Sequence, residues 1–282
     1  MLRVAFAGTF PARLKEPARR HLGIACEIVV ADETGIIAQL AGVDVLVTMA
    51  LTAEMGRAAT RLKLVQVPGA GLDRIDRSVL PDGVSLANVY GHETGIAEYV
   101  IGAMLALTRD FSRLDTALRA GEWRSQWSVG VAPPPTWSEL AGKTLGILGY
   151  GRIGQAVARR ARAFDMNISA IRRDVGPDDE PAFLGGPDSI GEVLGGSDYV
   201  LISMPATADT IGSIDRRQLA LMKSTAFLIN GRGRRSSMRM RSTRPWRGVR
   251  SRVPRLMCGI DIPASQAVQP RPRAPSTNCR MC

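Results

Sequence analysis

The sequence has 282 residues, of which 45% are hydrophobic, and its mean hydropathy is +0.00. This length predicts two domains with buried cores, and no apolar run reaches the roughly 18 residues that a membrane helix needs. The N-terminal segment lacks the pattern of a secretory signal, so we expect a cytoplasmic protein with no membrane partner. The four cysteines have no metal-ligand spacing, and we expect neither a metal site nor a disulfide framework.

The net charge of +11 is unevenly distributed along the chain. Residues 231–282 contain thirteen Arg, no Lys and one acid, Asp261, for a net charge of +12. Residues 1–230 therefore carry 11 − 12 = −1. A basic tail could bind nucleic acid, but the nearly neutral body argues against nucleic acid as the main partner.

Residues 1–92 alternate short apolar runs with amphipathic stretches. Strands alternating with helices in units of this length predict a parallel sheet with helices on its faces. We expect residues 1–92 to form a flavodoxin-like domain. The predicted strands are 2–8, 26–31, 43–49, 63–69 and 85–89, and the predicted helices are 11–22, 33–42 and 52–62.

Residues 93–111 predict a long helix that is too apolar for a surface helix, so we expect it to pack between domains or between the subunits of a homodimer. A loop-rich link follows, and a second strand–helix pattern begins at residue 139. We expect residues 93–230 to form the second domain, giving two doubly wound, Rossmann-like sheets. After residue 164 the predicted strands are 168–173, 199–205 and 225–230, and the predicted helices are 188–198 and 213–223.

Gly149, Gly151 and Gly154 have the G-x-G-x-x-G spacing in TLGILGYGRIGQ. The pattern follows an apolar strand and opens a helix, which is the context of a dinucleotide-binding loop. The first glycine permits a tight turn, the second lets the backbone approach a pyrophosphate, and the third permits close helix packing. The alternative is a purely structural turn.

An acidic residue usually ends the next strand of an NAD site, where it binds the ribose 2′-hydroxyl. Here the predicted strand ends in IRR, so Arg172 stands in the place of the acid and is followed by Arg173. A guanidinium suits a 2′-phosphate, so we favour NADP over NAD. The alternative is a solvated pair of arginines beside Asp174.

Four segments in order resemble the D-isomer-specific 2-hydroxyacid dehydrogenases. They are LKLVQVPGAGLDRID, TGIAEYVIGAMLALTRD, ELAGKTLGILGYGRIGQAVARRARAFDM and YVLISMPATADTIGSIDRRQLALMKSTAFLIN. The resemblance implies that the first domain is the substrate (catalytic) domain and that a nicotinamide cofactor exchanges hydride with a small 2-hydroxy or 2-keto acid. It also implies a substrate-carboxylate loop at Gly69, Ala70 and Gly71. Further cofactor contacts are implied at Arg152, Ile153, Met204, Pro205 and Thr210.

The resemblance also implies a catalytic His–Glu–Arg set, and the sequence departs from that pattern. Its two histidines, His21 and His92, do not match the catalytic position, and we expect both to be surface or cap-region residues. The family's arginine belongs three residues after Asn230, where Gly233 stands. Arg232 lies one residue away and is our candidate for that catalytic role.

The arginine-rich tail has a second explanation, which is a change of reading frame near codon 231. If one nucleotide was lost there, the code permits V-V-D-E-D-A-L-Y-A-A-L-A-R from Arg235 and F-H-E-L-P-N-V from Pro275. These strings resemble the family's next helix and the approach to its catalytic histidine. We therefore expect the second domain to be incomplete after residue 230, residues 231–282 to be disordered, and turnover to be impaired.

We thus predict a dehydrogenase-type oxidoreductase. The alternatives are a dinucleotide-binding module without catalysis and a nucleic-acid-binding protein that acts through its tail.

Overall fold

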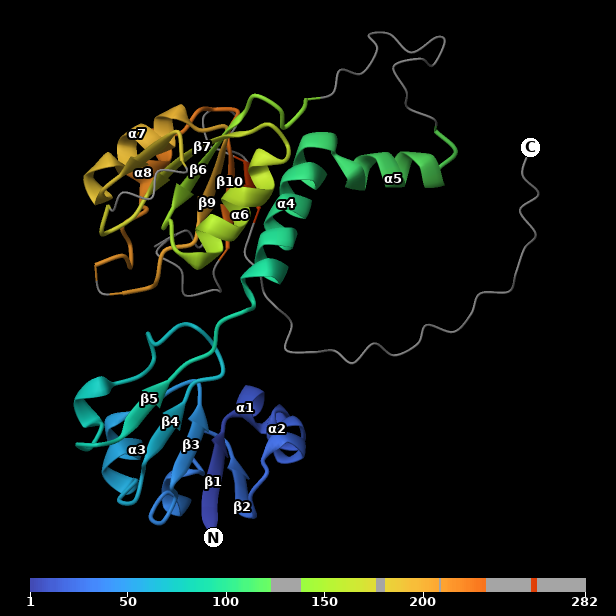
Figure 1. Ribbon diagram of the computed structural model, residues 1–282. Helices are drawn as coiled ribbons and strands as arrows, with labels where there is room; N and C mark the ends of the chain where they lie inside the picture. The colour runs from blue at the N-terminus through green and yellow to red at the C-terminus, as the bar shows by residue number, and fades with distance from the viewer. Residues whose placement is uncertain (123–137, 176–180, 208, 232–254, 258–282) are drawn as a thin grey trace.

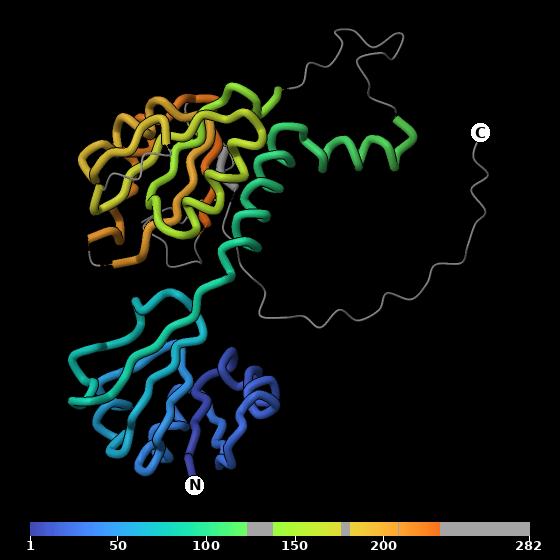
Figure 2. The backbone as a smooth tube through the Cα atoms, viewed as in Figure 1, coloured from blue at the N-terminus to red at the C-terminus, as the bar shows by residue number. Residues whose placement is uncertain are grey.

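The computed structural model describes residues 1–122, 138–175, 181–207 and 209–231, together with the backbone of 255–257. The chain forms two lobes, each built on a parallel sheet, and a long helix leads from the first to the second (Figures 1 and 2). The expected α/β architecture with two Rossmann-like sheets is confirmed. In the described residues, no helix is long and apolar enough to cross a membrane.

The first sheet has the strand order β2-β1-β3-β4-β5, and all its strands are parallel. This is the 2-1-3-4-5 order of flavodoxin-like sheets. Its strands are β1 (Leu2–Ala7), β2 (Cys26–Ala31), β3 (Val45–Thr48), β4 (Leu64–Gln66) and β5 (Ser85–Ala87). Its helices are α1 (Thr9–Arg13), α2 (Lys15–His21) and α3 (Ala53–Ala58), with 3-10 turns η1 (Ile37–Gln39) and η2 (Arg77–Val79).

The second sheet has the order β11-β10-β9-β6-β7-β8. Numbered from its own first strand, this is the 3-2-1-4-5-6 order of dinucleotide-binding folds, in which ligands bind where the order reverses. Here the reversal lies between β6 and β9. The strands are β6 (Thr144–Leu148), β7 (Asn167–Ile171), β8 (Phe183–Gly185), β9 (Tyr199–Ile202), β10 (Phe227–Asn230) and β11 (Arg255–Met257).

Helices cover both faces of the second sheet (Figure 1). Leu145 and Ile147 of β6 pack with α4 (Glu93–Arg109) and α6 (Arg152–Arg162) in one core. Leu148 belongs to the other core, with α7 (Ile190–Gly196) and residues around α8 (Arg216–Ala220). Side chains of β6 therefore point to both faces of the sheet and pack into two apolar layers. A 3-10 turn, η3 (Pro187–Ser189), precedes α7.

Helix α4 packs along α6 through small buried residues, including Ala97, Ala158 and Ala161. Small side chains let the two helix backbones approach closely, which explains the apolar character of residues 93–111. Asp110 adopts a left-handed conformation (φ 52°), and α5 (Phe111–Arg119) then extends away from the sheet (Figure 1).

The predicted helix at 33–42 is wrong, because this segment forms turns and only the short η1. The Asp32 carboxylate accepts hydrogen bonds from the N–H groups of Thr34 (3.1 Å) and Gly35 (2.6 Å), a local turn that competes with a helix. The predicted helix at 11–22 is instead the pair α1 and α2, since Pro17 lacks an N–H to continue the first helix.

The expectation that the second sheet ends at residue 230 needs correction. The backbone of β11 pairs in parallel with β10, in the register Phe227↔Arg255 to Ile229↔Met257. A strand edge offers backbone N–H and C=O groups for pairing, and even a three-residue segment can pair with them. One strand therefore forms inside residues 231–282.

Candidate functional site

The turn after β6 is built around Gly149. Its φ of +103° lies in the region that favours glycine, and a Cβ there would lie 2.4 Å from the Met204 nitrogen. The N–H groups of Gly149 and Tyr150 both donate to the Ile171 carbonyl oxygen, at 3.0 and 2.8 Å. The turn is thus held between the end of β7 and the loop after β9.

Gly151 and Gly154 have different surroundings in the same turn. A Cβ on Gly154 would lie 2.7 Å from the Gly149 oxygen, so this glycine lets α6 pack against the turn. Gly151 is the N-cap residue of α6, and a Cβ there would meet nothing within 4 Å. The first N–H groups of α6 have no partner within the helix and lie beside this open space, an arrangement that suits a phosphate group.

A pocket of about 170 Å³ opens at this turn. Its walls come from both lobes, so the glycine turn faces the end of the first domain. The lining residues are Ala70, Tyr90, His92, Glu93, Gly149, Gly151, Arg152, Ile153, Gly154 and Ser203.

The predicted substrate loop reaches this pocket through Ala70, whereas Gly69 and Gly71 do not line it. The loop is tied to the segment after β5, because Asn88 Nδ2 donates to the Ala70 oxygen (2.9 Å) and the Val89 N–H to the Gly69 oxygen (3.2 Å). Among the described residues, no group accepts a hydrogen bond from the N–H of Ala70 or Gly71. These two amides are available to an anion.

Arg152 lies over the ring of Tyr90, with its guanidinium carbon 4.3 Å from the ring centroid. Nearby, Glu93 Oε2 accepts a hydrogen bond from the Gly91 N–H (2.7 Å). The backbone N–H of Glu93 itself is the main cause that lowers the pKa of this carboxyl; burial opposes it, and the positive charge of Arg152 adds to the lowering. Sequence reasoning missed this contact, because Tyr90 and Arg152 belong to motifs far apart in the chain.

Arg172 and Arg173 follow β7 directly, next to the Ile171 carbonyl that holds the glycine turn. Arg173 is exposed. In the part of the chain that the structure describes, Nε of Arg172 is buried and has no hydrogen-bond partner. A buried donor without a partner at this end of the turn is a candidate ligand for an anion.

Met204, Pro205 and Thr210 lie on the loop after β9 but do not line the pocket. Met204 is 9% exposed and packs against Gly149. The Thr210 hydroxyl donates to the Pro205 oxygen and accepts from the Thr207 N–H (2.8 Å), which closes the loop on itself. In this structure these three residues stabilise the loop itself and the glycine turn beside it.

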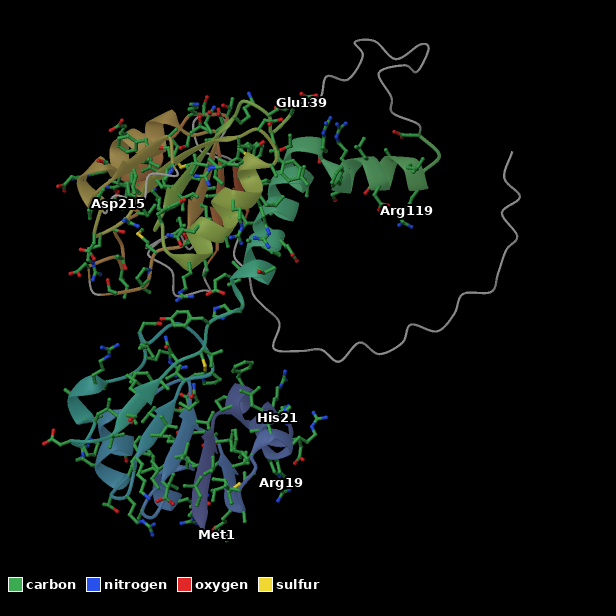
Figure 3. The ribbon with its side chains drawn as sticks, viewed as in Figure 1. Met1, Arg19, His21, Arg119, Glu139 and Asp215 are labelled. Carbon is green, nitrogen blue, oxygen red and sulfur yellow. The ribbon has the colours of Figure 1, made fainter. Side chains whose placement is uncertain are left out.

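The two histidines lie in different parts of the molecule. His21 is on α2, at the outer side of the first sheet (Figure 3). His92 is the exposed N-cap residue of α4, as expected, and it also lines the pocket. Arg232 lies outside the described residues. Among the residues described, no group of three or more His, Cys, Asp or Glu could hold a metal ion.

These features define an α/β protein whose second, doubly wound sheet carries a G-x-G-x-x-G turn at its switch point. Residues 101–236 match the family described as D-isomer specific 2-hydroxyacid dehydrogenase, NAD binding domain. Over these residues the chain is similar to the NAD binding domain of that family.

Named relatives agree with this assignment. A glyoxylate reductase of Thermococcus kodakarensis is 36% identical over 203 residues, which cover 69% of this chain and 60% of the relative. A hydroxypyruvate reductase of Thermotoga maritima is 34% identical over 193 residues, covering 67% of this chain and 60% of the relative. The chain thus spans about 60% of the length of these curated relatives.

A solved structure, an acyclic imino acid reductase in complex with NADPH and D-Arg, superposes with a TM-score of 0.65 at 26% identity. The match covers 82% of this chain and 74% of that one. All three proteins are named as reductases, so these matches give no support to the nucleic-acid alternative.

Proposed function

We propose that this protein binds a nicotinamide dinucleotide and exchanges hydride between it and a small 2-hydroxy or 2-keto acid. The observation that carries the proposal is the glycine turn at the switch point, where Gly151 opens onto a pocket that also holds Ala70 of the other lobe. The family's description as an NAD binding domain supports the nicotinamide cofactor.

The residues present fit such a cofactor, because a side chain at Gly149 or Gly154 would clash while the space beside Gly151 is open. In this proposal the α6 amides and Arg152 hold the pyrophosphate, and Ile153 packs over it. When bound, the nicotinamide supplies or accepts the hydride. Met204 and Pro205 support the adenosine side of the site through their loop, and Thr210 is assigned a place near the phosphates or the nicotinamide.

The substrate carboxylate is assigned to the amides of Ala70 and Gly71, while the Gly69 oxygen accepts a hydrogen bond from the Val89 N–H (3.2 Å) and ties the loop to the segment after β5. Ala70 lines the pocket, and two adjacent backbone donors suit one carboxylate. The predicted role of Arg232, clamping the substrate carboxylate and carbonyl, stays a prediction. Glyoxylate and hydroxypyruvate are the probes that the named relatives suggest.

NADP is the proposed form of the cofactor, and the unpartnered Nε of Arg172 supports it. A 2′-phosphate offers charge-assisted hydrogen bonds that a 2′-hydroxyl cannot match. We expect Arg172→Ala to weaken NADPH binding about tenfold or more and to leave NADH binding nearly unchanged. Arg173→Ala, at an exposed position, is the matched control. Equal affinity of the unmodified protein for NADH and NADPH would contradict the preference.

A homodimer through α4 and α5 is also proposed, and a cytoplasmic location remains a prediction. The support for the dimer is that Tyr99, Phe111 and Leu118 are 42%, 51% and 56% exposed on these helices. Large exposed apolar side chains favour association. Light scattering coupled to size-exclusion chromatography measures the state directly.

The proposed function is tested in two steps on the purified chain. Fluorescence titration measures the affinity for NADPH and NADH, and absorbance at the nicotinamide band then follows reduction of glyoxylate or hydroxypyruvate. Binding followed by turnover supports the proposal. Binding with no turnover on either acid favours the alternative of a dinucleotide-binding module, and absence of binding contradicts both.

A further inference from the structure

We propose that Tyr90 positions Arg152 for the cofactor pyrophosphate, so that the first lobe contributes to nucleotide affinity at a distance from the nicotinamide. The inference rests on the proposed function, since it assumes that a dinucleotide occupies the glycine turn. It assigns Tyr90 as a positioning residue that acts through Arg152.

The contact joins elements of the two lobes. Tyr90 lies between β5 and α4, whereas Arg152 is the first residue of α6, directly after Gly151. The guanidinium carbon is 4.3 Å from the ring centroid, and both residues line the same pocket. The arginine therefore rests on a residue from outside its own domain while its head group lies beside the open space at Gly151.

Stacking leaves the donors of Arg152 available. A guanidinium stacks through its flat face, whereas its N–H groups point outward in its own plane. The ring of Tyr90 can thus hold the face of Arg152 while the N–H edge donates to two phosphate oxygens. An arginine held in this way loses less side-chain entropy when the pyrophosphate binds than a freely rotating one.

The segment that carries Tyr90 is itself built to hold its shape. Gly91 has a φ of +104°, which favours glycine, and its N–H donates to Glu93 Oε2 at 2.7 Å. The neighbouring Asn88 donates to the Ala70 oxygen at 2.9 Å. The ring is therefore attached to a turn fixed at both sides, and the Glu93 carboxylate adds a negative charge near Arg152.

Three variants separate positioning from other effects. Tyr90→Phe keeps the ring face, and Tyr90→Leu keeps an apolar side chain but removes the π face. Phe164→Leu is the matched control, since Phe164 is 38% exposed, follows the far end of α6 and does not line the pocket. Affinities for NADPH and NADH are measured by fluorescence titration, and thermal unfolding of the free proteins checks that each variant is folded.

We expect Tyr90→Leu to weaken NADPH and NADH about two- to fivefold and by the same factor, because an exposed cation–π contact is of that strength and the pyrophosphate is common to both. Tyr90→Phe restores the affinity, and Phe164→Leu has no effect. Equal or tighter binding by Tyr90→Leu overturns the inference and leaves the proposed function standing. Failure of the unmodified protein to bind either nucleotide overturns both.

Discussion

At the residue scale, Gly149 and Gly151 belong to one turn but have different constraints. Gly149→Ala places a Cβ 2.4 Å from backbone at a φ of +103°, and we expect it to lower the free energy of unfolding by about 2–3 kcal/mol. Gly151→Ala meets no atom within 4 Å, so stability should change by less than about 0.5 kcal/mol. Its methyl group enters the space assigned to the pyrophosphate, and nucleotide affinity should fall.

Denaturant unfolding and nucleotide titration of both glycine variants check this prediction. The pair acts as its own control, because the same methyl group is added two residues apart. Equal stability of the two variants would show that the turn tolerates a side chain at Gly149, and the structural account of the fingerprint would then fail.

Asp198 gives a prediction that depends on pH. Burial raises the pKa of this carboxyl, but the Thr144 N–H (2.9 Å) and the Lys223 ammonium (3.0 Å) lower it more, so the net pKa lies below its usual value. A depressed folded-state pKa adds stability above the unfolded pKa of about 3.9, and this is lost as pH falls through the folded value. Asp198→Asn should therefore cost about 1 kcal/mol at pH 7.

The measurement for Asp198 is urea unfolding of both proteins between pH 7 and pH 3. The difference in unfolding free energy should shrink as the pH falls below about 4, because the carboxyl of the unmodified protein is then protonated. A difference that stays constant over this range would show that the charge of Asp198 does not stabilise the junction of β6 and β9.

At the element scale, the two sides of α4 respond differently to added volume. Ala97 is fully buried against α6, so Ala97→Leu should lower the free energy of unfolding by about 1–3 kcal/mol. Gly102 is exposed, and its added Cβ meets nothing within 4 Å, so Gly102→Ala should raise it by about 1 kcal/mol through helix propensity. Thermal unfolding compares both, and a stabilising Ala97→Leu would contradict the packing of α4 on α6.

An element could be predicted from the sequence when the interactions that form it join residues close together in the chain. The strand, glycine turn and helix at 144–162 were predictable because their signals are local and consistent. The segment at 33–42 was not, since the Asp32 carboxylate hydrogen bonds decide its conformation. Strands β8 and β11 are three residues long and depend on pairing with distant strands, which no local pattern shows.

At the scale of the whole molecule, the candidate site is made by bringing two lobes together. The glycine motif and the loop at 69–71 each have a local signature, so both were found in the sequence. Their meeting in one pocket, and the stacking of Arg152 on Tyr90, depend on how the lobes are placed. Local patterns contain no information about how the lobes are placed. The sequence therefore predicted His92 as a surface or cap residue, and it did not predict that His92 lines the pocket.

Turnover by the whole molecule requires both a bound dinucleotide and a group that transfers a proton to the substrate. In the proposed function the nucleotide affinity comes from residues 149–154, which the structure describes, so we expect the chain to bind the dinucleotide. Proton transfer by a positioned acid is worth about 10²–10⁴-fold in rate. Neither His21 nor His92 matches the family's catalytic histidine. We therefore expect glyoxylate reduction at least about 10²-fold slower than by a chain whose gene carries one added nucleotide at codon 231.

Both proteins are compared under the same cofactor concentration, and the nucleotide affinities measured alongside serve as the control for folding of the second lobe. The added nucleotide restores the frame in which the code permits the segment L-P-N-V that approaches the catalytic histidine. Equal rates would contradict the frame-change hypothesis and would make residues 231–282 part of a working enzyme. A rate gain with unchanged nucleotide affinity would locate the defect in proton transfer and leave the glycine turn intact.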